Sequence, residues 1–400
     1  MKKVIAIVMM LVMTLSVIVG CGQQTPATSP DASQPAQSTQ SAQPASQQPD
    51  QSSPSGMQTY DVKMSIQYAP QQCVPYWHAK ENGVFDKYGI VIDYDNVPWY
   101  SAGAPQLEAQ PGGEWDIGLI GYTAAIRAAT AYDMANIGMC GFDTSDAVIC
   151  REDSDIYQAG KGQIDGYPNI YGTADLWKGK TVILTLATTR DVCMQMVLGA
   201  MGLTYDDVTV LNMDNDSGWQ AFLNGEGDLW VPAGSFGAQA LANDSSFKKI
   251  ADINDVDLAM FNTFVTPIDW AAANRDEVVH FMAAFLEAIM WCGDPANKET
   301  MAEYYQTIMK EEGGIDYTLA EAGACVDKVL WPDLAFFESY STDPDGDGQT
   351  VYQDYLEKFF DGHAMVGIAD PADKQTVLGS ADTTYLDEAI ALYKSMNNIQ

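Results

Sequence analysis

The sequence predicts an α/β protein built from two lobes of similar topology, with a largely parallel sheet. Short apolar stretches alternate with helical patterns along residues 60–400, which is typical of sheets covered by helices. A weak internal repeat supports two lobes, because residues 113–117 (GEWDI) recur as residues 225–229 (GEGDL), each time after a helix-like stretch and before an apolar strand. This region is long enough for two domains of ordinary size.

The N-terminus has the three parts of a secretory signal peptide. Two lysines precede an uncharged apolar run over residues 4–19, and the small residue Gly20 stands before Cys21. The run is shorter than the ~20 residues that cross a bilayer, so a retained membrane helix is the weaker alternative. Its end resembles the lipobox of bacterial lipoproteins, in which the cysteine receives a diacylglycerol. We expect residues 1–20 to be removed and Cys21 to anchor the protein by lipid at the extracellular face of the cell membrane.

Residues 22–57 consist almost entirely of Gln, Ser, Pro, Ala and Thr. A segment with so few large apolar side chains cannot bury a core, so we expect residues 21–57 to be a lipidated cysteine and a disordered linker. A flexible coil of this length has an r.m.s. reach of roughly 30–35 Å, which would keep a folded body close to a membrane partner.

The composition is strongly acidic, with a formal net charge of −34 at pH 7. A field of this sign repels nucleic acid and anionic membrane surfaces, so we expect neither as a partner. The simplest interpretation is an acidic surface that keeps an exposed protein in solution, and we expect a monomer. An anionic ligand would need a locally favourable pocket.

Hydrophobic periodicity places the individual elements. The predicted strands include residues 62–68, 90–94, 115–120, 181–186 and 208–212. The clearest helix is Arg275–Cys292, where apolar residues repeat at helical spacing. Asn274 suits the N-cap of this helix, and Gly293 suits its end.

Six cysteines follow Cys21, and six thiols allow fifteen pairings. The pair that the sequence favours is Cys140 with Cys150, because the short apolar runs 135–142 and 147–150 could form a hairpin. Free buried thiols are the alternative.

Several segments, taken in order, resemble one protein family. They are residues 76–85 (YWHAKENGVF), 88–90 (YGI), 113–121 (GEWDIGLIG), 175–181 (DLWKGKT) and 225–229. This succession looks like the nitrate/sulfonate/taurine type of periplasmic binding protein, which shares its fold with the thiamine-pyrimidine precursor proteins. The resemblance covers residues 60–291 and fades beyond them.

The resemblance implies a two-lobed periplasmic-binding-protein type 2 fold with a ligand cleft between the lobes, which close on binding. Lobe one would comprise residues 58–150 and 263–400, and lobe two residues 151–262. The resemblance also implies the substrate-binding component of an ABC importer, which delivers a small solute to a permease in the membrane. We expect an organic solute, either an anion of the sulfonate, nitrate or taurine kind or an aromatic compound.

Ligands of open α/β sheets bind beyond the carboxyl ends of the strands, where helix N-termini present free N–H groups. Candidate residues in lobe one are Gln72, Tyr76, Trp77, Gly121, Tyr122 and Thr123, and candidates in lobe two are Thr188, Thr189, Arg190, Trp219, Gly234 and Ser235. We expect the two threonines and Arg190 to hold an anionic group, and the aromatic residues Tyr76, Tyr122 and Trp219 to enclose the ligand. The alternatives are a surface arginine and aromatic side chains that pack in the core.

Residues 343–354 (DPDGDGQTVYQD) fit the spacing of an EF-hand calcium loop. The expected ligands are Asp343, Asp345, Asp347, the backbone of Gln349, and Asp354. An aspartate at the twelfth position predicts reduced affinity, because glutamate is the usual bidentate ligand there. Carboxylates this close repel one another unless a cation neutralises them, so we expect structural calcium; an acidic solvated turn is the alternative.

Enzyme motifs are incomplete in this sequence. Residues 174–181 imitate a phosphate-binding loop, but alanine replaces its first glycine. Residues 233–237 (AGSFG) imitate a nucleophile elbow, again with alanine in place of the first glycine, and only three histidines are available as bases. We expect no enzyme activity and no catalytic cofactor; the alternative is a surface-anchored enzyme or sensor with the same two-lobed fold.

Overall fold

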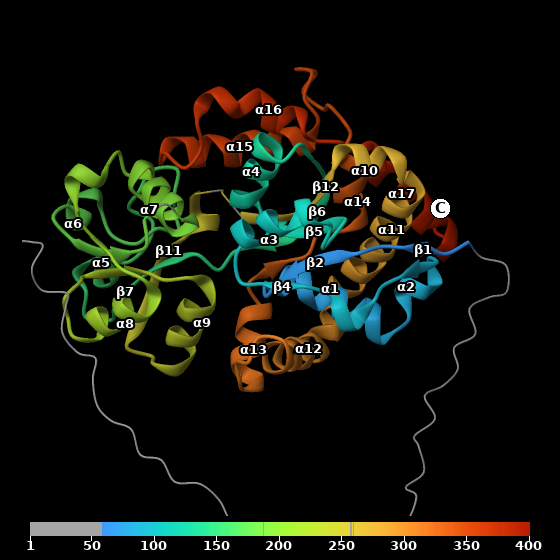
Figure 1. Ribbon diagram of the computed structural model, residues 1–400. Helices are drawn as coiled ribbons and strands as arrows, with labels where there is room; N and C mark the ends of the chain where they lie inside the picture. Colours follow the sequence, from blue (N-terminus) through green and yellow to red (C-terminus); the bar gives the residue numbers. More distant parts are fainter. Residues whose placement is uncertain (1–57, 187, 257, 259) are drawn as a thin grey trace, which may run out of the picture. The chain divides into compact units, whose positions relative to one another are not determined.

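A computed structural model describes residues 58–186, 188–256, 258 and 260–400, except the side chains of Asp216 and Ser235. The expected signal peptide (1–20), the linker (21–57) and the lipidation site Cys21 lie outside the described residues. Within the described part, helices cover two β-sheets, as the ribbon in Figure 1 shows. The prediction of an α/β fold is therefore confirmed.

The larger sheet has the strand order β13-β6-β12-β5-β2-β4, and we call the part of the chain that carries it lobe one. Its strands are β13 (Val329–Leu330), β6 (Met134–Asp143), β12 (Met260–Pro267), β5 (Ile117–Gly121), β2 (Met64–Gln67) and β4 (Trp99–Tyr100). The first helices of this lobe are α1 (Pro70–Glu81), α2 (Val84–Lys87), α3 (Gly103–Ala109) and α4 (Tyr122–Ala131). β1 (Tyr60–Asp61) and β3 (Ile90–Val91) form a separate parallel pair.

The smaller sheet has the order β11-β7-β10-β8-β9, and it defines lobe two. Its strands are β11 (Phe247–Asp252), β7 (Ala147–Arg151), β10 (Leu229–Val231), β8 (Thr181–Leu184) and β9 (Thr209–Asn212). The helices of this lobe are α5 (Asp155–Ala159), α6 (Ala174–Trp177), α7 (Thr189–Ala200), α8 (Asn215–Leu223) and α9 (Gly234–Asn243).

Both sheets are mixed, which corrects the prediction of a largely parallel sheet. β8 pairs in parallel with β9 and β10, and β2 pairs in parallel with β4 and β5. In contrast, β7 runs antiparallel to its neighbours β10 and β11, and β12 runs antiparallel to its neighbours β5 and β6. β7 and β12 are the strands by which the chain enters each sheet from the other lobe.

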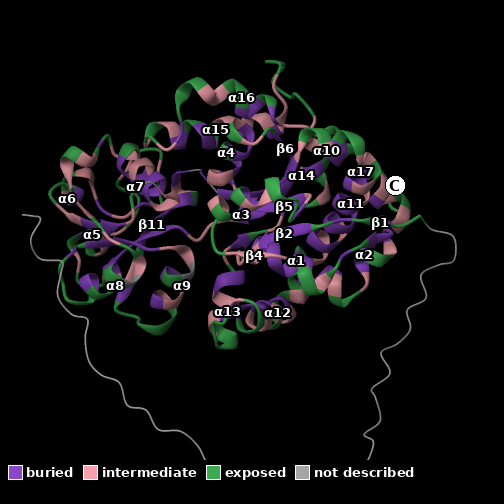
Figure 2. Cartoon of the chain, in the orientation of Figure 1, coloured by how far each residue is buried: buried purple, intermediate pink, exposed green. Residues whose placement is uncertain are grey.

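Alternation along β8 shows why this strand needs cover on both faces. Val182 and Leu184 belong to the main core, which also contains Val192 of α7. Ile183 belongs to a second cluster with Phe222 of α8. Successive side chains of a strand point to opposite faces, so the apolar run fits a strand buried between two helical layers. Figure 2 shows the buried residues gathered on the strands of both sheets.

The internal repeat has the same structural role in both lobes. Asp116 precedes β5, and its carboxylate accepts a hydrogen bond from the backbone N–H of Lys63, beside β2, at 3.1 Å. Asp228 precedes β10, and its carboxylate accepts a hydrogen bond from the N–H of Thr181, at the start of β8, at 2.8 Å. In each lobe the N–H of the aspartate also donates to the carbonyl of the same partner. The repeat thus fixes strand pairing.

Two connections join the lobes. β6 ends at Asp143 in lobe one and β7 begins at Ala147 in lobe two, and the chain returns from β11 to β12 through a 3-10 turn at Ile253–Val256. The boundaries expected at 150/151 and 262/263 therefore fall within β7 and β12.

The hairpin expected between residues 135–142 and 147–150 does not form, because β6 and β7 enter different sheets. The predicted Cys140–Cys150 disulfide is therefore wrong. Both thiols are free and buried, as are the other four cysteines of the described chain, which agrees with the alternative.

The helix predicted over Arg275–Cys292 is confirmed with these bounds as α11. The expected cap bond is absent from the described contacts of Asn274. Its side-chain amide donates instead to the carbonyl of Trp270 at 2.8 Å, because Asn274 also ends the preceding helix, α10 (Ile268–Ala273).

The chain after α11 completes lobe one and also reaches lobe two. Its helices are α12 (Lys298–Glu311), α13 (Leu319–Val326), α14 (Leu334–Ser339), α15 (Val351–Met365), α16 (Lys374–Gly379) and α17 (Thr384–Asn397). α17 packs along α11, whereas α13 contacts α9 and α15 contacts α7. Among the described helices, none combines the length and the apolar character of a membrane-spanning segment.

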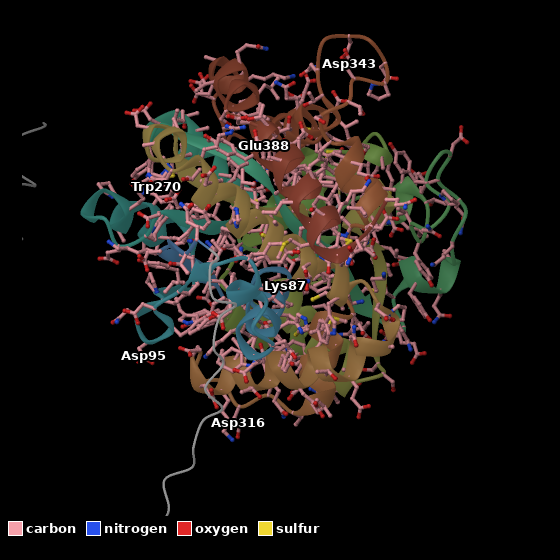
Figure 3. All side chains as sticks on the ribbon, turned by 90° about the vertical axis from the view of Figure 1, so that its right-hand side faces the viewer. Lys87, Asp95, Trp270, Asp316, Asp343 and Glu388 are labelled. Atoms are coloured by element: carbon pink, nitrogen blue, oxygen red, sulfur yellow. The ribbon has the colours of Figure 1, made fainter. Side chains whose placement is uncertain are left out.

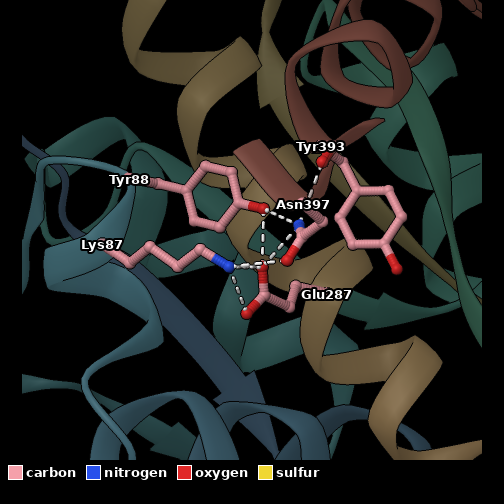
Figure 4. Close-up of polar contacts among 5 residues, drawn as sticks. All are labelled: Lys87, Tyr88, Glu287, Tyr393 and Asn397. Carbon is pink, nitrogen blue, oxygen red and sulfur yellow. Dashed lines mark hydrogen bonds and ion pairs between the residues drawn. The ribbon is translucent and has the colours of Figure 1, made fainter. Parts of the chain in front are cut away.

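A polar network joins α17 to α2 and α11 (Figure 4). The carboxylate of Glu287 accepts hydrogen bonds from Nζ of Lys87 at 2.6 Å, from the hydroxyl of Tyr88 at 2.7 Å and from Nδ2 of Asn397 at 2.9 Å. Burial raises the pKa of Glu287, but these three donors outweigh burial and hold the pKa below its usual value. The network therefore stabilises the fold while Glu287 is ionised.

Candidate ligand-binding site

Two adjoining cavities are lined by residues of both lobes. The larger has a volume of about 430 Å³ and the smaller about 220 Å³. They share Asp143, Ser145, Thr189, Ala233 and Gly234, so we treat them as one cleft. A further cavity of about 450 Å³, next to Val62 and Ile92, is lined by lobe one alone. Only a cleft with walls from both lobes can close on a ligand by lobe movement.

Four helices begin at the cleft. Their first residues are Pro70 of α1, Tyr122 of α4, Thr189 of α7 and Gly234 of α9, and each lines at least one of the two cavities. The first N–H groups of a helix have no acceptor within the helix, and the positive end of the helix dipole lies there. The cleft therefore favours a negatively charged or strongly polar group, as expected beyond the carboxyl ends of the strands.

Arg190 supplies a positive side chain to the smaller cavity. It is the second residue of α7, and its Nε is buried without a hydrogen-bond partner among the described residues. Burial lowers the pKa of the guanidinium, whereas the nearby carboxylate of Asp146 raises it. A buried N–H without an acceptor is costly, so a ligand oxygen would be stabilised here.

Two carboxylates from the first interlobe connection line the same cavity. Burial and the negative charge of Asp143 raise the pKa of Asp146 to about 6, although Thr189 and Arg190 act in the opposite direction. Asp143 accepts hydrogen bonds from the backbone N–H of Ser145 at 2.8 Å and from the side chain of Gln71. The cleft thus carries charges of both signs.

Glutamine side chains form the lobe-one wall. Oε1 of Gln67 accepts a hydrogen bond from the N–H of Gly121 at 3.2 Å, and Nε2 of Gln67 donates to Gln106 at 2.9 Å. The N–H of Gln67 donates to Oε1 of Gln72 at 2.8 Å, so Gln72 supports the wall from behind. Gln71 lines the larger cavity, is only 1% exposed, and has an Oε1 atom without a partner.

Half of the expected binding residues line the smaller cavity: Gly121, Tyr122, Thr123, Thr189, Arg190 and Gly234. The hydroxyl of Tyr122 donates to the carbonyl of Leu356 at 2.7 Å, and Oγ1 of Thr123 is hydrogen-bonded to Nε2 of His363 at 2.8 Å. Both partners belong to α15, so this helix holds the first turn of α4 in place beside the cavity. A Cβ atom at Gly234 would overlap the side chain of Ser145, so glycine permits the close approach of α9 to the interlobe connection.

Three expected residues lie within α1 and not in a loop. Pro70 starts α1 directly after Ala69, because proline suits the first turn of a helix. Gln72, Tyr76 and Trp77 are consequently buried helix residues, and neither cavity includes them.

Two further expected residues, Trp219 and Thr188, also lie outside the cavity walls. Trp219 packs against Trp230 and Phe247, with ring centroids 5.0 Å and 5.4 Å apart, in the core of lobe two. Thr188 precedes α7, and its hydroxyl donates to the carbonyl of Thr185 at 2.6 Å. The side chain of Ser235 lies outside the described residues.

Sequence reasoning missed several polar residues of the cleft. They are Gln67 at the end of β2, Gln71 in the first turn of α1, Asp143, Ser145 and Asp146 at the first interlobe connection, Asn262 in β12, and Lys328 before β13. Residues 143–146 (DTSD) join the two apolar runs that the sequence predicts as a hairpin. The signal that could have identified this segment is a pair of acidic residues between two largely apolar strands.

The acidic loop lies apart from the cleft, and Figure 3 shows Asp343 on a loop at the surface. The carboxylate of Asp343 accepts hydrogen bonds from the N–H groups of Gly346 at 2.7 Å and Gly348 at 3.0 Å. Gly348, at the sixth loop position, has a φ of 91°, which glycine tolerates. Burial, followed by the charges of neighbouring carboxylates, raises the pKa of Asp354. In the described residues, no three His, Cys, Asp or Glu side chains are placed to hold a metal ion.

The sequence is similar to bacterial binding proteins. Residues 166–297 match the family described as NMT1/THI5 like. A protein of Brachyspira hyodysenteriae named as an ABC transporter periplasmic binding protein is 24% identical over 326 residues, which cover 79% of this chain and 86% of the relative. A Bacillus subtilis protein named as an aliphatic sulfonates-binding protein is 24% identical over 249 residues, covering 58% and 66%.

Solved structures give the same fold at lower sequence identity. The periplasmic aliphatic sulphonate binding protein of Escherichia coli is 16% identical with a TM-score of 0.56, covering 78% of this chain and 91% of the other. The periplasmic nitrate-binding protein of Synechocystis is 14% identical with a TM-score of 0.57, covering 86% and 91%. The resemblance expected from the sequence is confirmed: residues 166–297 match the NMT1/THI5-like family, and the chain has the fold of the solved periplasmic binding proteins.

Proposed function

We propose that this chain is the solute-binding component of an ABC importer, which captures a small polar solute between its lobes and presents it to a permease. The observation that carries this function is the convergence of four helix N-termini, two from each lobe, on one cleft. Helix N-termini stabilise anionic or polar groups, and a ligand held by both lobes would favour lobe closure. The names of the similar proteins support the same function.

Native mass spectrometry of the full chain, purified without denaturant, tests this function. We expect one small solute per chain, retained without chemical change during prolonged incubation. A surface enzyme with the same fold would convert the solute, and a sensor would require a macromolecular partner. Conversion of the retained solute would favour the enzyme alternative.

Arg190 and the N-terminus of α7 are proposed to hold a negatively charged part of the solute. Nε of Arg190 is buried and lacks an acceptor among the described residues, and Thr189 and Arg190 both line the smaller cavity. The aromatic enclosure expected from the sequence is reduced to Tyr122 from lobe one, since Tyr76 and Trp219 pack in the cores. Three aromatic residues that the sequence did not predict, Tyr68, Tyr305 and Phe261, also line the cavities, so polar and aromatic side chains together would hold the body of the solute.

The location proposed for this receptor is the outer face of the cell membrane, with Cys21 carrying the lipid. The sequence pattern before Cys21 supports this anchor. A linker over residues 22–57 would allow the folded part to reach a permease without leaving the membrane.

The loop at residues 343–354 is proposed to bind calcium as a stabilising ion. Its spacing and the positive φ of Gly348, 91°, support this proposal. The carboxylates of Asp343, Asp345 and Asp347 raise the pKa of Asp354 after burial does so, which indicates mutual repulsion that a cation would relieve. The acidic solvated turn remains the alternative.

A further inference from the structure

A negative side chain, Asp146, stands where the proposed function places the negative part of the solute. It lines the smaller cavity together with Thr189 and Arg190, the first two residues of α7, and it is 8% exposed. Burial raises the pKa of Asp146, whereas a hydrogen bond from the side chain of Thr189 and the charge of Arg190 lower it. Asp146 is thus an internal counter-ion at the N-terminus of α7, and an anion bound there must share this position with it.

The backbone of Asp146 is held against lobe two. Its carbonyl accepts a hydrogen bond from the N–H of Ile253, on the second interlobe connection, at 3.1 Å, and one from Sγ of Cys193, in α7, at 3.7 Å. The next residue, Ala147, already pairs with Asp252 of β11. Because Asp146 and Arg190 are fixed to the same lobe, movement of the lobes does not carry the carboxylate away from the guanidinium.

The repulsion between this carboxylate and a bound anion is larger than the cost of protonating it. The smaller cavity has a volume of only about 220 Å³, so an anion beside Arg190 lies within several ångström of Asp146. One like charge about 6 Å away, at an effective dielectric constant of about 20, weakens binding by about 100-fold. Burial and the charge of Asp143 raise the pKa of Asp146 to about 6, so protonation at pH 7 weakens binding by only about ten-fold.

From this arrangement we infer that an anion that binds beside Arg190 is accompanied by one proton, which the carboxylate of Asp146 takes up from the solvent. The inference rests on the proposed receptor function and adds a regulation to the same site. Water or buffer supplies the proton, an O–H bond forms on Asp146, and no other covalent bond changes. The affinity for anions therefore rises as the pH falls from about 8 to about 6, because the protonated form binds them better.

The other titratable side chains in and behind this cavity, among the described residues, do not supply this proton site. They are Asp143, Tyr122, Cys193, Asp252, Asp255 and His363. Burial raises the pKa of Tyr122 and of Cys193 well above the usual values and lowers that of His363, so all three are neutral near pH 7. Burial also raises the pKa of Asp143, but hydrogen bonds from Ser145 and Gln71 favour its ionised form. Asp252 and Asp255 line neither cavity of the cleft.

Isothermal titration calorimetry of the full chain with nitrate and with propanesulfonate measures the proton uptake. Both probes are anions of strong acids, so neither changes its own protonation near neutral pH. Titrations at pH 7 in bis-Tris and in Tris, at equal chloride concentration, differ in heat according to the number of protons that the buffer loses. We expect about 0.8 proton per bound anion, and about ten-fold weaker binding at pH 7.5 than at pH 6.

A variant separates this role from a structural one. Asp146→Asn removes the charge and keeps the size of the side chain, so it should bind the probes about ten-fold more tightly than the unaltered protein at pH 7, without proton uptake. A side chain that only supported the cleft would weaken binding when replaced. Asp175→Asn is the matched control, because this carboxylate in α6 of lobe two is 90% exposed, and the variant should behave as the unaltered protein does. Thermal unfolding of each variant establishes that the fold is retained.

The outcomes distinguish this inference from the receptor function. Bound probes with equal heats in both buffers and an affinity independent of pH would overturn the proton uptake and leave the receptor standing, and so would weaker binding by Asp146→Asn. If neither probe binds, the same titrations use the solute that native mass spectrometry identifies; a neutral solute, or an anionic one bound without a proton, overturns the inference alone. If no probe binds and no solute is retained, both the inference and the receptor function are overturned.

Discussion

Replacing Arg190 by glutamine removes the guanidinium from the smaller cavity and keeps a side chain of moderate length. Nε of Arg190 is buried and has no acceptor among the described residues, so the replacement breaks no described hydrogen bond of this atom. What is lost is the charge-assisted bond to a ligand oxygen, worth roughly 1.5–3 kcal/mol, or about 10- to 150-fold in affinity.

The loss should lie toward the upper part of this range. Arg190 also lowers the pKa of Asp146 by its positive charge. Without the guanidinium, the two carboxylates of the interlobe connection are left without their nearest described cation in the smaller cavity, and the anionic end of a ligand meets greater repulsion. The effect should therefore appear in the dissociation constant of any solute with a negative group.

Calorimetry with the solute identified by native mass spectrometry measures this change. Arg127→Gln is the matched control, because Arg127 is an exposed residue of α4 and the replacement alters the net charge equally. Its affinity should equal that of the unaltered protein. If Arg190→Gln binds a negatively charged solute within about two-fold of the unaltered protein, Arg190 does not hold the anion.

Three further perturbations have defined outcomes. Glu287→Gln should lower the free energy of unfolding by ~1–3 kcal/mol near neutral pH, because it weakens the hydrogen bonds from Lys87, Tyr88 and Asn397. The control Glu388→Gln should lower the free energy of unfolding by only ~0–1 kcal/mol, because the ion pair of Glu388 is exposed. The pKa of Glu287 is lowered in the folded state, so the stabilisation is complete above the unfolded pKa and is lost as the pH falls through the folded pKa. Cys21→Ser should release the protein from the membrane fraction of producing cells. Calcium should raise the melting temperature after EDTA treatment, and Asp345→Ala should abolish this rise.

Each of these outcomes has a result that contradicts it. Equal denaturation curves for Glu287→Gln and Glu388→Gln would mean that the network in Figure 4 contributes no more than a surface ion pair. Membrane retention of Cys21→Ser equal to that of the unaltered protein would exclude the lipid anchor. A melting temperature that does not respond to calcium would leave residues 343–354 as an acidic turn.

The local pattern of apolar and polar residues is enough to predict much of the fold. The repeat of apolar residues at helical spacing predicted the bounds of α11, Arg275–Cys292, because a helix buried along one face repeats its apolar residues at a fixed interval. The strand expected at residues 181–186 appears as Thr181–Leu184, since an uninterrupted apolar run suits a strand covered on both faces. The repeated aspartates also indicated two lobes, and their hydrogen bonds at strand starts give the reason.

Sequence pattern likewise predicts some of the candidate binding residues and not others. Thr189, Arg190 and Gly121 were accessible to sequence reasoning, because helix N-termini that follow strands lie at one edge of a sheet. Tyr76 and Trp219 were not, because an aromatic side chain near a strand end has the same local pattern whether it faces a ligand or a core. Their burial depends on which surfaces pack against α1 and α8.

Tertiary structure alone decided where the chain crosses between lobes. The segment from Asp143 to Asp146 has the composition of a hairpin turn, and nothing local distinguishes a turn within one sheet from a passage between two. Strand partners are chosen by long-range pairing, so β6 and β7 separate into different sheets and leave Cys140 and Cys150 unpaired. That choice places two carboxylates in the cavity that Arg190 also lines, so the presence of both charges in the cleft is a property of the fold that the order of residues does not reveal.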